Sequence, residues 1–282
     1  MESLLLDRFA TLSHPMRMAI FRLLMRRCPD ALPAGEIAAA LHLKASTASV
    51  HLAALTRVGL ITQRRAGTRL LYAVSLDAAR AVVSGLFVDC CRGRADLCPP
   101  QLSDLVTRSA APPSDKRHVL FVCTGNSARS ILAESILRDM AEGRFTACSA
   151  GTAPRPQIHP MAIDLLTEKG HDTRALRSKS LAQAQQDAPR APDFVITVCD
   201  SAANEDTSLW PHRPFAAHWG MPDPARAQGP AQTRRAFEQT YDLLHHRITS
   251  FTTLPFESLS PAAVQARLDT IGTHIPDRSM TP

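Results

Sequence analysis

The sequence lacks the features that would place a protein in a membrane or outside the cell. No stretch of its 282 residues approaches the roughly 18 consecutive apolar residues of a membrane span, although 45% of the chain is apolar. The first residues, MESLLLDRF, contain an acid at position 2 and no basic segment, so we expect no signal peptide. We therefore expect a cytoplasmic protein without a membrane partner, long enough for two domains.

The chain also lacks the even set of cysteines that a disulfide framework requires. Its seven cysteines include one adjacent pair, Cys90-Cys91. An odd number favours a reducing compartment and reactive thiols over a disulfide scaffold. Cys28 is expected to be structural.

Neither part of the chain has an excess of acidic residues, and only the N-terminal part has an excess of basic residues. Residues 1–116 contain 15 Lys and Arg against 9 Asp and Glu, a net charge of +6, whereas residues 117–282 contain 17 of each. This asymmetry favours a polyanionic partner for the N-terminal part only.

The functional prediction depends most on one motif, His118-Val-Leu-Phe-Val-Cys-Thr-Gly-Asn-Ser-Ala-Arg-Ser130. Val119–Val122 is typical of a buried strand, and helical spacing begins after Ser130. A strand, a tight loop and a helix N-terminus make a cradle for a tetrahedral oxyanion, to which Arg129 adds a two-donor fork. The same positive features are expected to lower the pKa of Cys123 and make it a nucleophile. The alternative is a core cysteine that ends a strand.

Hydrophobic spacing predicts helices in the first domain over residues 4–12, 15–27, 33–41, 45–58 and 77–88. A tight turn at His42-Leu-Lys joins the third helix to the fourth, which makes a helix-turn-helix with residues 45–58 as recognition helix. We expect Val50, Leu52, Leu55 and Val58 to face inward. The fifth helix is a candidate dimer contact.

A β-hairpin over Gly59–Val74, with its tip at Ala66-Gly67-Thr68, is expected to form a wing that touches phosphates or the minor groove. The expected DNA-binding residues are the polar side chains of the recognition helix and the arginines of the wing: Ser46, Thr47, Ser49, His51, Arg64, Arg65 and Arg69. A solvated helix face, or a helix-turn-helix used only for dimerisation, are the alternatives.

The first hundred residues resemble the ArsR-type winged-helix repressors. The motifs that carry the resemblance are His14-Pro-Met-Arg, Glu36-Ile-Ala, Ala45-Ser-Thr-Ala-Ser-Val-His-Leu-Ala-Ala-Leu and Gly59-Leu-Ile. It implies a homodimer that binds operator DNA and senses a metal or metalloid.

Cys90, Cys91 and Cys98 lie within nine residues, with Gly93 between them to give the segment slack. Three thiolates suit trivalent arsenic or antimony, whereas the absence of a nearby histidine disfavours a mixed zinc site. The segment resembles the arsenite site of one branch of the repressor family, so arsenite or antimonite is the expected inducer that releases DNA. One or two buried cysteines with a chance third is the alternative.

The predicted domains are residues 1–98, a proline-containing linker at 99–116, a second domain at 117–272 and a flexible tail at 273–282. In the second domain, strands are expected at 119–122, 145–152 and 193–199, and helices at 160–169, 237–251 and 261–271. This alternation predicts an α/β fold with a central parallel sheet covered on both faces. Ligands bind at the carboxyl ends of such strands, where Cys123 and Cys199 are expected to lie.

The second domain resembles, over nearly its whole length, arsenate reductases of the low-molecular-weight tyrosine phosphatase fold. The motifs are Val122-Cys-Thr-Gly-Asn-Ser-Ala-Arg-Ser, Ser149-Ala-Gly-Thr, Val198-Cys-Asp-Ser-Ala-Ala and His218-Trp-Gly-Met-Pro-Asp-Pro-Ala.

The resemblance implies a role for each matching residue. Cys123 would be the nucleophile on arsenate, Ser130 would support its thiolate, and Asp223 would protonate the leaving oxygen. Arg129 would bind the oxyanion together with the loop Thr124, Gly125, Asn126, Ser127 and Ala128. No tightly bound cofactor is expected, although Asn126, Glu134 and Ser149 match positions that hold the loop, in some relatives through potassium. A turn residue is the alternative for Asp223.

Two departures bear on the reductant. Thioredoxin-coupled relatives commonly carry a cysteine where this chain has Ala128, and a resolving cysteine where it has Thr207. The resemblance leaves Cys199 as the thiol that attacks the arsenic adduct, or else an external thiol such as glutathione or mycothiol. The expected partner is then a glutaredoxin, mycoredoxin or thioredoxin-like protein. Cys148 is a lesser candidate.

The sequence thus predicts an arsenite-responsive repressor fused to a thiol-dependent arsenate reductase. Two alternatives stay open. One is a phosphotyrosine phosphatase fused to a regulator, and the other is a catalytically dead domain that senses oxyanions.

Overall fold

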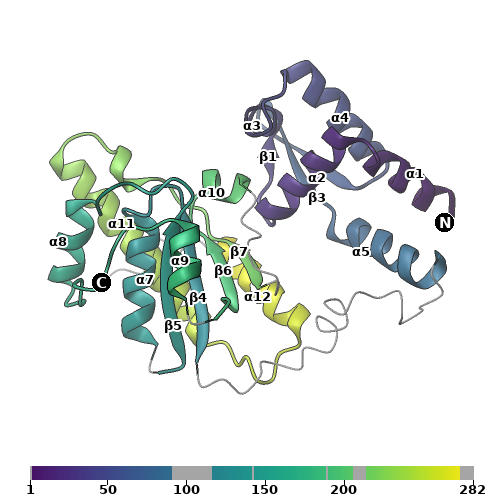
Figure 1. Ribbon diagram of the computed structural model, residues 1–282. Coiled ribbons are helices and arrows are strands. Elements are labelled where there is room, and N and C mark those ends of the chain that lie inside the picture. The colour runs from purple at the N-terminus through teal and green to yellow at the C-terminus, as the bar shows by residue number, and fades with distance from the viewer. Residues whose placement is uncertain (1, 91–115, 142, 189, 206–213, 274–282) are drawn as a thin grey trace. The chain divides into compact units, whose positions relative to one another are not determined.

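The computed structural model describes residues 2–90, 116–141, 143–188, 190–205 and 214–273 (Figure 1). The chain divides into two compact units between Thr107 and Arg108. This point falls within the segment predicted as a linker, nearly all of which lies outside the described residues. Each unit has its own hydrophobic core.

The first unit is a winged helix-turn-helix, as predicted. Its elements in chain order are α1 (Glu2–Leu12), α2 (Pro15–Arg27), β1 (Leu32–Pro33), α3 (Ala34–Ala40), α4 (Ala45–Arg57), β2 (Ile61–Ala66), β3 (Arg69–Val74), α5 (Leu76–Ser84) and the π-helical η1 (Gly85–Cys90). β2 and β3 form the predicted hairpin, and the turn between them contains Gly67 at φ +61°. The two-residue strand β1 pairs with β3 and was not predicted, because so short a strand has no period.

The prediction for Val50 is wrong. The buried residues of α4 are Ala48, Leu52 and Leu55, whereas the Val50 side chain is exposed, with a relative accessibility of 68%. Two residues along a helix turn through about 200°, so Val50 lies opposite Ala48. It therefore shares the outward face with Ser46 and Thr47.

The second unit is an α/β domain with a four-stranded parallel sheet in the order β5-β4-β6-β7, and helices pack on both sides of it (Figure 1). Its strands are β4 (Arg117–Cys123), β5 (Phe145–Gly151), β6 (Phe194–Thr197) and β7 (Phe215–His218). Its helices are α7 (Arg129–Met140), α8 (Pro160–Glu168), α9 (Leu181–Asp187), α10 (Asp200–Asn204), the 3-10 turn η3 (Pro224–Arg226), α11 (Pro230–Thr252) and α12 (Pro261–Thr273).

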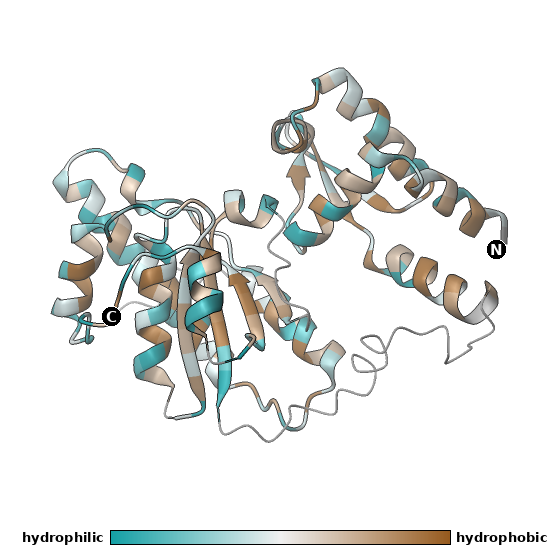
Figure 2. Cartoon of the chain, in the orientation of Figure 1, coloured by the Kyte–Doolittle hydropathy of each residue, from teal (hydrophilic) through white to brown (hydrophobic). Residues whose placement is uncertain are grey.

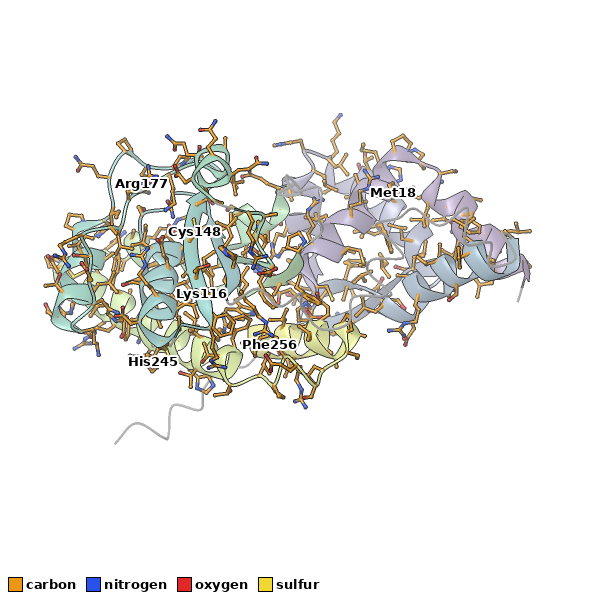
Figure 3. All side chains as sticks on the ribbon, turned by 60° about the horizontal axis from the view of Figure 1, so that its bottom comes forward. Met18, Lys116, Cys148, Arg177, His245 and Phe256 are labelled. Carbon is orange, nitrogen blue, oxygen red and sulfur yellow. The ribbon has the colours of Figure 1, made fainter. Side chains whose placement is uncertain are left out.

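The parallel sheet confirms the predicted fold class, although β7, α9 and α10 were missed as short elements of weak pattern. The central strands are apolar, as Figure 2 shows in brown, because both of their faces are covered. Phe145 and Phe194, the first residues of β5 and β6, form an aromatic cluster with Phe251 and Phe256, the last of which is labelled in Figure 3.

The register brings the functional ends of the strands together. Cys123 at the end of β4 pairs with Gly151 at the end of β5, and Val122 pairs with Thr197 at the end of β6. Cys199 lies two residues beyond β6 and is buried. The two cysteines therefore meet at one edge of the sheet, as the sequence predicted.

Within the described ranges, no helix has both the length and the apolar character needed to cross a bilayer.

Candidate active site

The loop between β4 and α7 is shaped by the segment that follows β5. The carbonyl oxygens of Thr124, Gly125 and Ser127 accept hydrogen bonds of 2.9 Å from the backbone N–H groups of Ala153, Arg155 and His159. The loop carbonyls are thus engaged on the outside, which leaves the loop N–H groups to face the cavity at the N-terminus of α7.

Gly151 makes this close approach feasible. A Cβ atom at this position would lie 2.6 Å from the carbonyl oxygen of Thr124, which is closer than any real contact. The glycine in Ser149-Ala-Gly-Thr is therefore required by packing against the loop.

Cys123 is buried at the base of the cradle, with a relative accessibility of 2%. Its Sγ lies 3.0 Å from the Ser130 Oγ and accepts a 3.2 Å hydrogen bond from the Asn126 backbone N–H. Burial raises the pKa of the Cys123 thiol above its ordinary value, although the hydrogen bond from Ser130 and the charge of Arg129 act to lower it. The predicted lowering is therefore wrong in net direction, because the sequence does not reveal how deeply the thiol lies.

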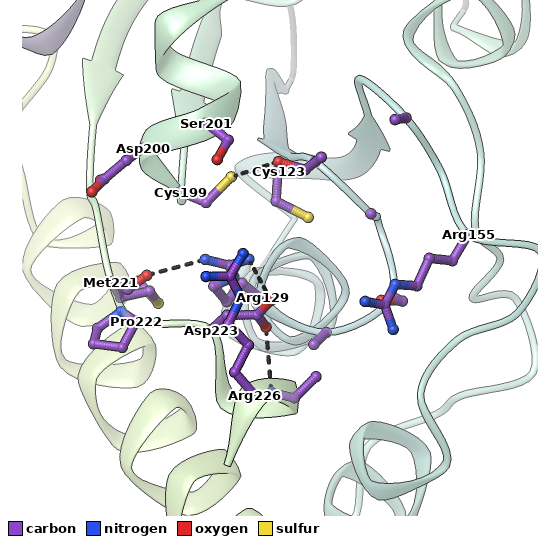
Figure 4. A pocket seen from close by; sticks show the side chains of 16 residues that line it. Cys123, Arg129, Arg155, Cys199, Asp200, Ser201, Met221, Pro222, Asp223 and Arg226 are labelled. Atoms are coloured by element: carbon purple, nitrogen blue, oxygen red, sulfur yellow. Dashed lines mark hydrogen bonds and ion pairs between the residues drawn. The ribbon is translucent and has the colours of Figure 1, made fainter. Parts of the chain in front are cut away.

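Arg129 and Asp223 come from distant parts of the chain and meet at this cavity. Their side chains are 3.4 Å apart between Nη2 and Oδ2, and the Arg129 Nη1–H donates to the Met221 carbonyl at 3.1 Å (Figure 4). The Arg129 Nε–H is buried and finds no acceptor among the described residues. A buried donor at an anion cradle suits a residue that binds an oxyanion. Asp223 also caps the turn η3 through Ala225, as the turn alternative expects, while its role as the acid stays a prediction.

A buried polar network holds the loop from beneath. The Asn126 Nδ2–H₂ donates to the Ser130 Oγ at 2.9 Å and to the Ser149 Oγ at 2.8 Å, and the Ser149 Oγ–H donates to the Glu134 Oε2 at 2.5 Å. Because the Ser130 oxygen accepts from Asn126, its hydroxyl hydrogen is available to the Cys123 sulfur. The network also stabilises Asn126 at φ +41°, a conformation rare outside glycine.

Lys179 completes this network and was not predicted. Its backbone N–H donates to the Asn126 Oδ1 at 2.8 Å, and its Nζ lies 3.6 Å from the Glu134 Oε2. Both side chains of this ion pair are almost fully buried. Arg138 contacts the same carboxylate. Glu134 thus has cationic partners within the chain, so these residues do not fit an additional potassium ion.

Cys199 lines the same cavity as Cys123 (Figure 4). Its Sγ lies 3.4 Å from the Thr124 Oγ1 and is likewise 2% exposed. Cys148 is half-buried on β5 and lines a different hollow, beside Ala147 and Ala188 (Figure 3). Because it lines this other hollow and lies three residues before the end of β5, it is a poor partner for Cys123. Ala128 gives the cavity wall no third thiol, and Thr207 lies outside the described residues.

The cavity measures about 540 Å³ and has residues that sequence reasoning missed. Arg155 and Arg226 line it with Asp200 and Ser201. Arg155 follows the carboxyl end of β5. Because ligands bind at the carboxyl ends of parallel strands, its place in the sequence could have identified it as a candidate. Arg247, buried on α11, donates to the carbonyls of Trp219 and Gly220 and so fixes the segment that leads to Asp223. No local signal marks Arg247 or Lys179.

In the first unit, most of the predicted DNA-binding residues are exposed. Ser46, Thr47 and Ser49 lie on the outward face of α4, and the wing arginines Arg64, Arg65 and Arg69 are exposed on β2 and β3. His51 differs, because its ring packs 4.7 Å from that of His14 and is half-buried. Burial, then the charges of His14 and Arg17, lower the pKa of His51.

The predicted arsenite site falls largely outside the described residues. Cys90 ends η1 and is exposed, while Cys91 and Cys98 lie in the segment 91–115. The site stays a prediction.

Comparisons with known proteins match both units. Residues 118–263 match the low molecular weight phosphotyrosine protein phosphatase family, and residues 12–64 match a helix-turn-helix domain. The chain is 32% identical over 137 residues to an arsenate reductase of Shouchella clausii. This match covers 48% of the present chain and 95% of the reductase. An arsenate reductase of Bacillus subtilis is 31% identical over 138 residues, covering 49% and 96%.

Among solved structures, the chain is similar to the homodimeric winged helix-turn-helix DNA-binding domain of a possible ArsR-family regulator from Mycobacterium bovis. The identity is 30%, the TM-score is 0.27, and the match covers 30% of this chain and 78% of that one.

Proposed function

The chain belongs to the low molecular weight phosphotyrosine protein phosphatase family through residues 118–263, and we propose that this domain reduces arsenate to arsenite at Cys123. Similarity to arsenate reductases over nearly their whole length supports the assignment. The observation that carries it is the pair of buried thiols, Cys123 and Cys199, in one cavity with the Arg129 guanidinium.

In the first step, the Cys123 thiolate attacks arsenate and forms an Sγ–As bond. One oxygen leaves as water after protonation by Asp223, whose carboxyl pairs with Arg129 at the cavity. The loop N–H groups and Arg129 stabilise the negative charge on the remaining oxygens. The Ser130 hydroxyl stabilises the thiolate that starts the step.

In the second step, the Cys199 thiolate attacks the Cys123 sulfur. The Sγ–As bond breaks and its electron pair goes to arsenic, which leaves as arsenite, reduced from +5 to +3. The two cysteines are oxidised to a disulfide, and an external thiol donor must reduce it. The donor is drawn from the glutathione–glutaredoxin, mycothiol–mycoredoxin or thioredoxin class, since Ala128 supplies no thiol to extend the relay.

The alternative chemistry is phosphotyrosine hydrolysis, which the same cradle can perform with Cys123, Arg129 and Asp223. Phosphotyrosine hydrolysis does not require a second thiol such as Cys199. Arsenate reduction requires it to attack the Cys123 sulfur. A purely sensing domain would leave both thiols without a task. The burial of Cys199 beside Thr124, facing the same cavity, therefore favours reduction.

The first unit acts in this proposal as an arsenite-responsive repressor that binds operator DNA through α4 and the wing. It does so as a homodimer, and in the cytoplasm, where the DNA is. Apolar residues exposed on α1 and α5, including Leu6 and Val83, supply a surface for the dimer. Arsenite bound by Cys90, Cys91 and Cys98 would change the spacing of the two recognition helices and release DNA.

One experiment tests the enzyme. Arsenate reduction by the purified full chain is measured with the thioredoxin, glutathione–glutaredoxin and mycothiol–mycoredoxin systems in turn. We expect turnover with at least one of them, and its loss in both Cys123→Ser and Cys199→Ser. Turnover of p-nitrophenyl phosphate without any arsenate reduction would establish the phosphatase instead.

A gel-shift assay tests the repressor. Arsenite is expected to release operator DNA from the wild-type chain and to leave Cys91→Ser bound. Normal release from the variant would rule out the thiolate site.

A further inference from the structure

Three arginines line the active-site cavity, against two carboxylates, those of Asp200 and Asp223. Arg129 already supplies the fork that faces the cradle, yet the guanidinium groups of Arg155 and Arg226 also line the cavity (Figure 4). The volume of about 540 Å³ falls in the range of roughly 300–1,000 Å³ typical of small-molecule sites, so the cavity has room for a second ligand beside the oxyanion.

Both the backbone and the side chain of Arg155 contact the oxyanion loop. Its backbone N–H donates to the Gly125 carbonyl at 2.9 Å. Its side chain lies along the same residue, since a Cβ on Gly125 would sit 3.4 Å from the Arg155 Cγ and 3.5 Å from its Nε. Arg155 therefore packs against position 125 of the loop at van der Waals distance and lines the cavity from there.

The charge of Arg155 is the one least balanced by the chain. Asp223 pairs with Arg129 at 3.4 Å and approaches Arg226 at 3.9 Å. Among the described residues, the Arg155 guanidinium has no hydrogen bond or ion pair with any acceptor. An exposed arginine held at the mouth of a reactive site is suited to bind a carboxylate bidentately.

We propose that Arg155 binds a carboxylate of the low-molecular-weight thiol that regenerates the enzyme, which places that thiol in the glutathione class and not among thiols without carboxylates. This inference rests on the proposed function. Arg226, on the opposite side of the cavity, adds attraction for a second carboxylate.

The thiol's part in the reaction is a disulfide exchange. Its thiolate attacks the Cys123–Cys199 disulfide, a mixed disulfide with the protein forms, and one protein thiolate is released. A second thiol molecule attacks the mixed disulfide and releases the other protein thiolate with an oxidised dimer of the small thiol. Two small thiols lose two electrons in total, and the protein disulfide gains them.

The test compares glutathione with its glycyl monoethyl ester, which has the same thiol and one carboxylate fewer. The measured quantity is the ratio of kcat/KM for the two thiols in arsenate reduction by the full chain. Arg155→Gln is expected to lower the preference for glutathione about fivefold, as for an exposed charge pair, and Arg155→Glu to lower it further. Arg174→Gln is the matched control, because Arg174 is an exposed arginine that pairs with Asp172 and does not line the cavity.

Binding of S-methylglutathione, measured by calorimetry, tests the same contact without turnover. This ligand keeps both carboxylates but has no free thiol, so Arg155→Gln should raise its Kd about fivefold, whereas Arg174→Gln should not. An unchanged preference together with an unchanged Kd overturns the inference, and so does a rise confined to the KM for arsenate, which would assign Arg155 to the oxyanion. If the wild-type chain reduces no arsenate even with dithiothreitol, the proposed function fails, while the calorimetric result still decides whether Arg155 binds the thiol's carboxylate.

Discussion

The two units of this chain place their functional residues in opposite environments. In the second unit, Cys123, Asn126 and Glu134 are at most 2% exposed, and hydrogen bonds fix their neighbours. In the first unit, Ser46 and the wing arginines are exposed on the surface. The proposed oxyanion site is a pre-arranged cradle of buried groups, whereas a DNA groove must be met from outside by side chains that stay solvated until they bind. The activity of the second unit should therefore respond strongly to a single substitution of a buried residue. The DNA affinity of the first unit should depend on the total charge of its exposed residues.

The largest effect is expected from Cys123→Ser. Removal of a nucleophile should lower arsenate turnover by about 10³-fold or more, while operator affinity in gel shifts stays within about twofold of wild type. A loss of DNA binding in the same variant would break the comparison, because it would show that the two units do not act independently in the absence of arsenic.

Lys179→Met tests the buried ion pair. Loss of Lys179 leaves the buried Glu134 carboxylate with Arg138 but without its buried cationic partner, which should lower the free energy of unfolding by up to about 3 kcal/mol. Tryptophan fluorescence in urea measures this for the second unit alone, because Trp210 and Trp219 are the only tryptophans in the sequence. The double variant Lys179→Met/Glu134→Gln should recover part of the loss.

The same variant tests whether the chain supplies its own cation. Arsenate turnover by the wild-type protein should be equal in potassium and sodium buffers, whereas Lys179→Met should gain activity from potassium. A strong potassium dependence in the wild-type protein would contradict the role given to Lys179.

The triple change of Arg64, Arg65 and Arg69 to Ala sharpens the other side of the comparison. Operator affinity should fall about tenfold at moderate salt, and the slope of log K against log salt should decrease by about 2 to 3, since each lost phosphate contact removes about one counterion. Titrations by fluorescence anisotropy at several salt concentrations measure both quantities. Arsenate turnover should be unaltered.

The smallest effect is expected from Ser130→Ala. The Ser130 hydrogen bond lowers the pKa of the Cys123 thiol, so its removal should raise that pKa further above the ordinary value. Only the thiolate reacts with iodoacetamide, and a higher pKa leaves less thiolate at a given pH. Alkylation of Cys123 should therefore be a few-fold slower near neutral pH, with its pH profile moved to the alkaline side. A faster reaction would mean that Ser130 does not donate to the sulfur.

The sequence by itself determined the oxyanion loop, the order of Cys123 and Arg129 within it, the helix-turn-helix with its wing, and the arrival of Cys199 at a neighbouring strand end. Each of these depends on residues close together in the chain, or on the rule that parallel strands end at a common edge.

Only the tertiary structure decided which distant residues support that loop. Lys179 reaches Asn126 and Glu134 from 53 and 45 positions away, and Arg247 fixes the Asp223 segment from α11. The outward position of Val50 and the raised pKa of Cys123 were also decided there. These features depend on helix phase, burial and non-local packing, which leave no trace in the local pattern of hydrophobic and polar residues.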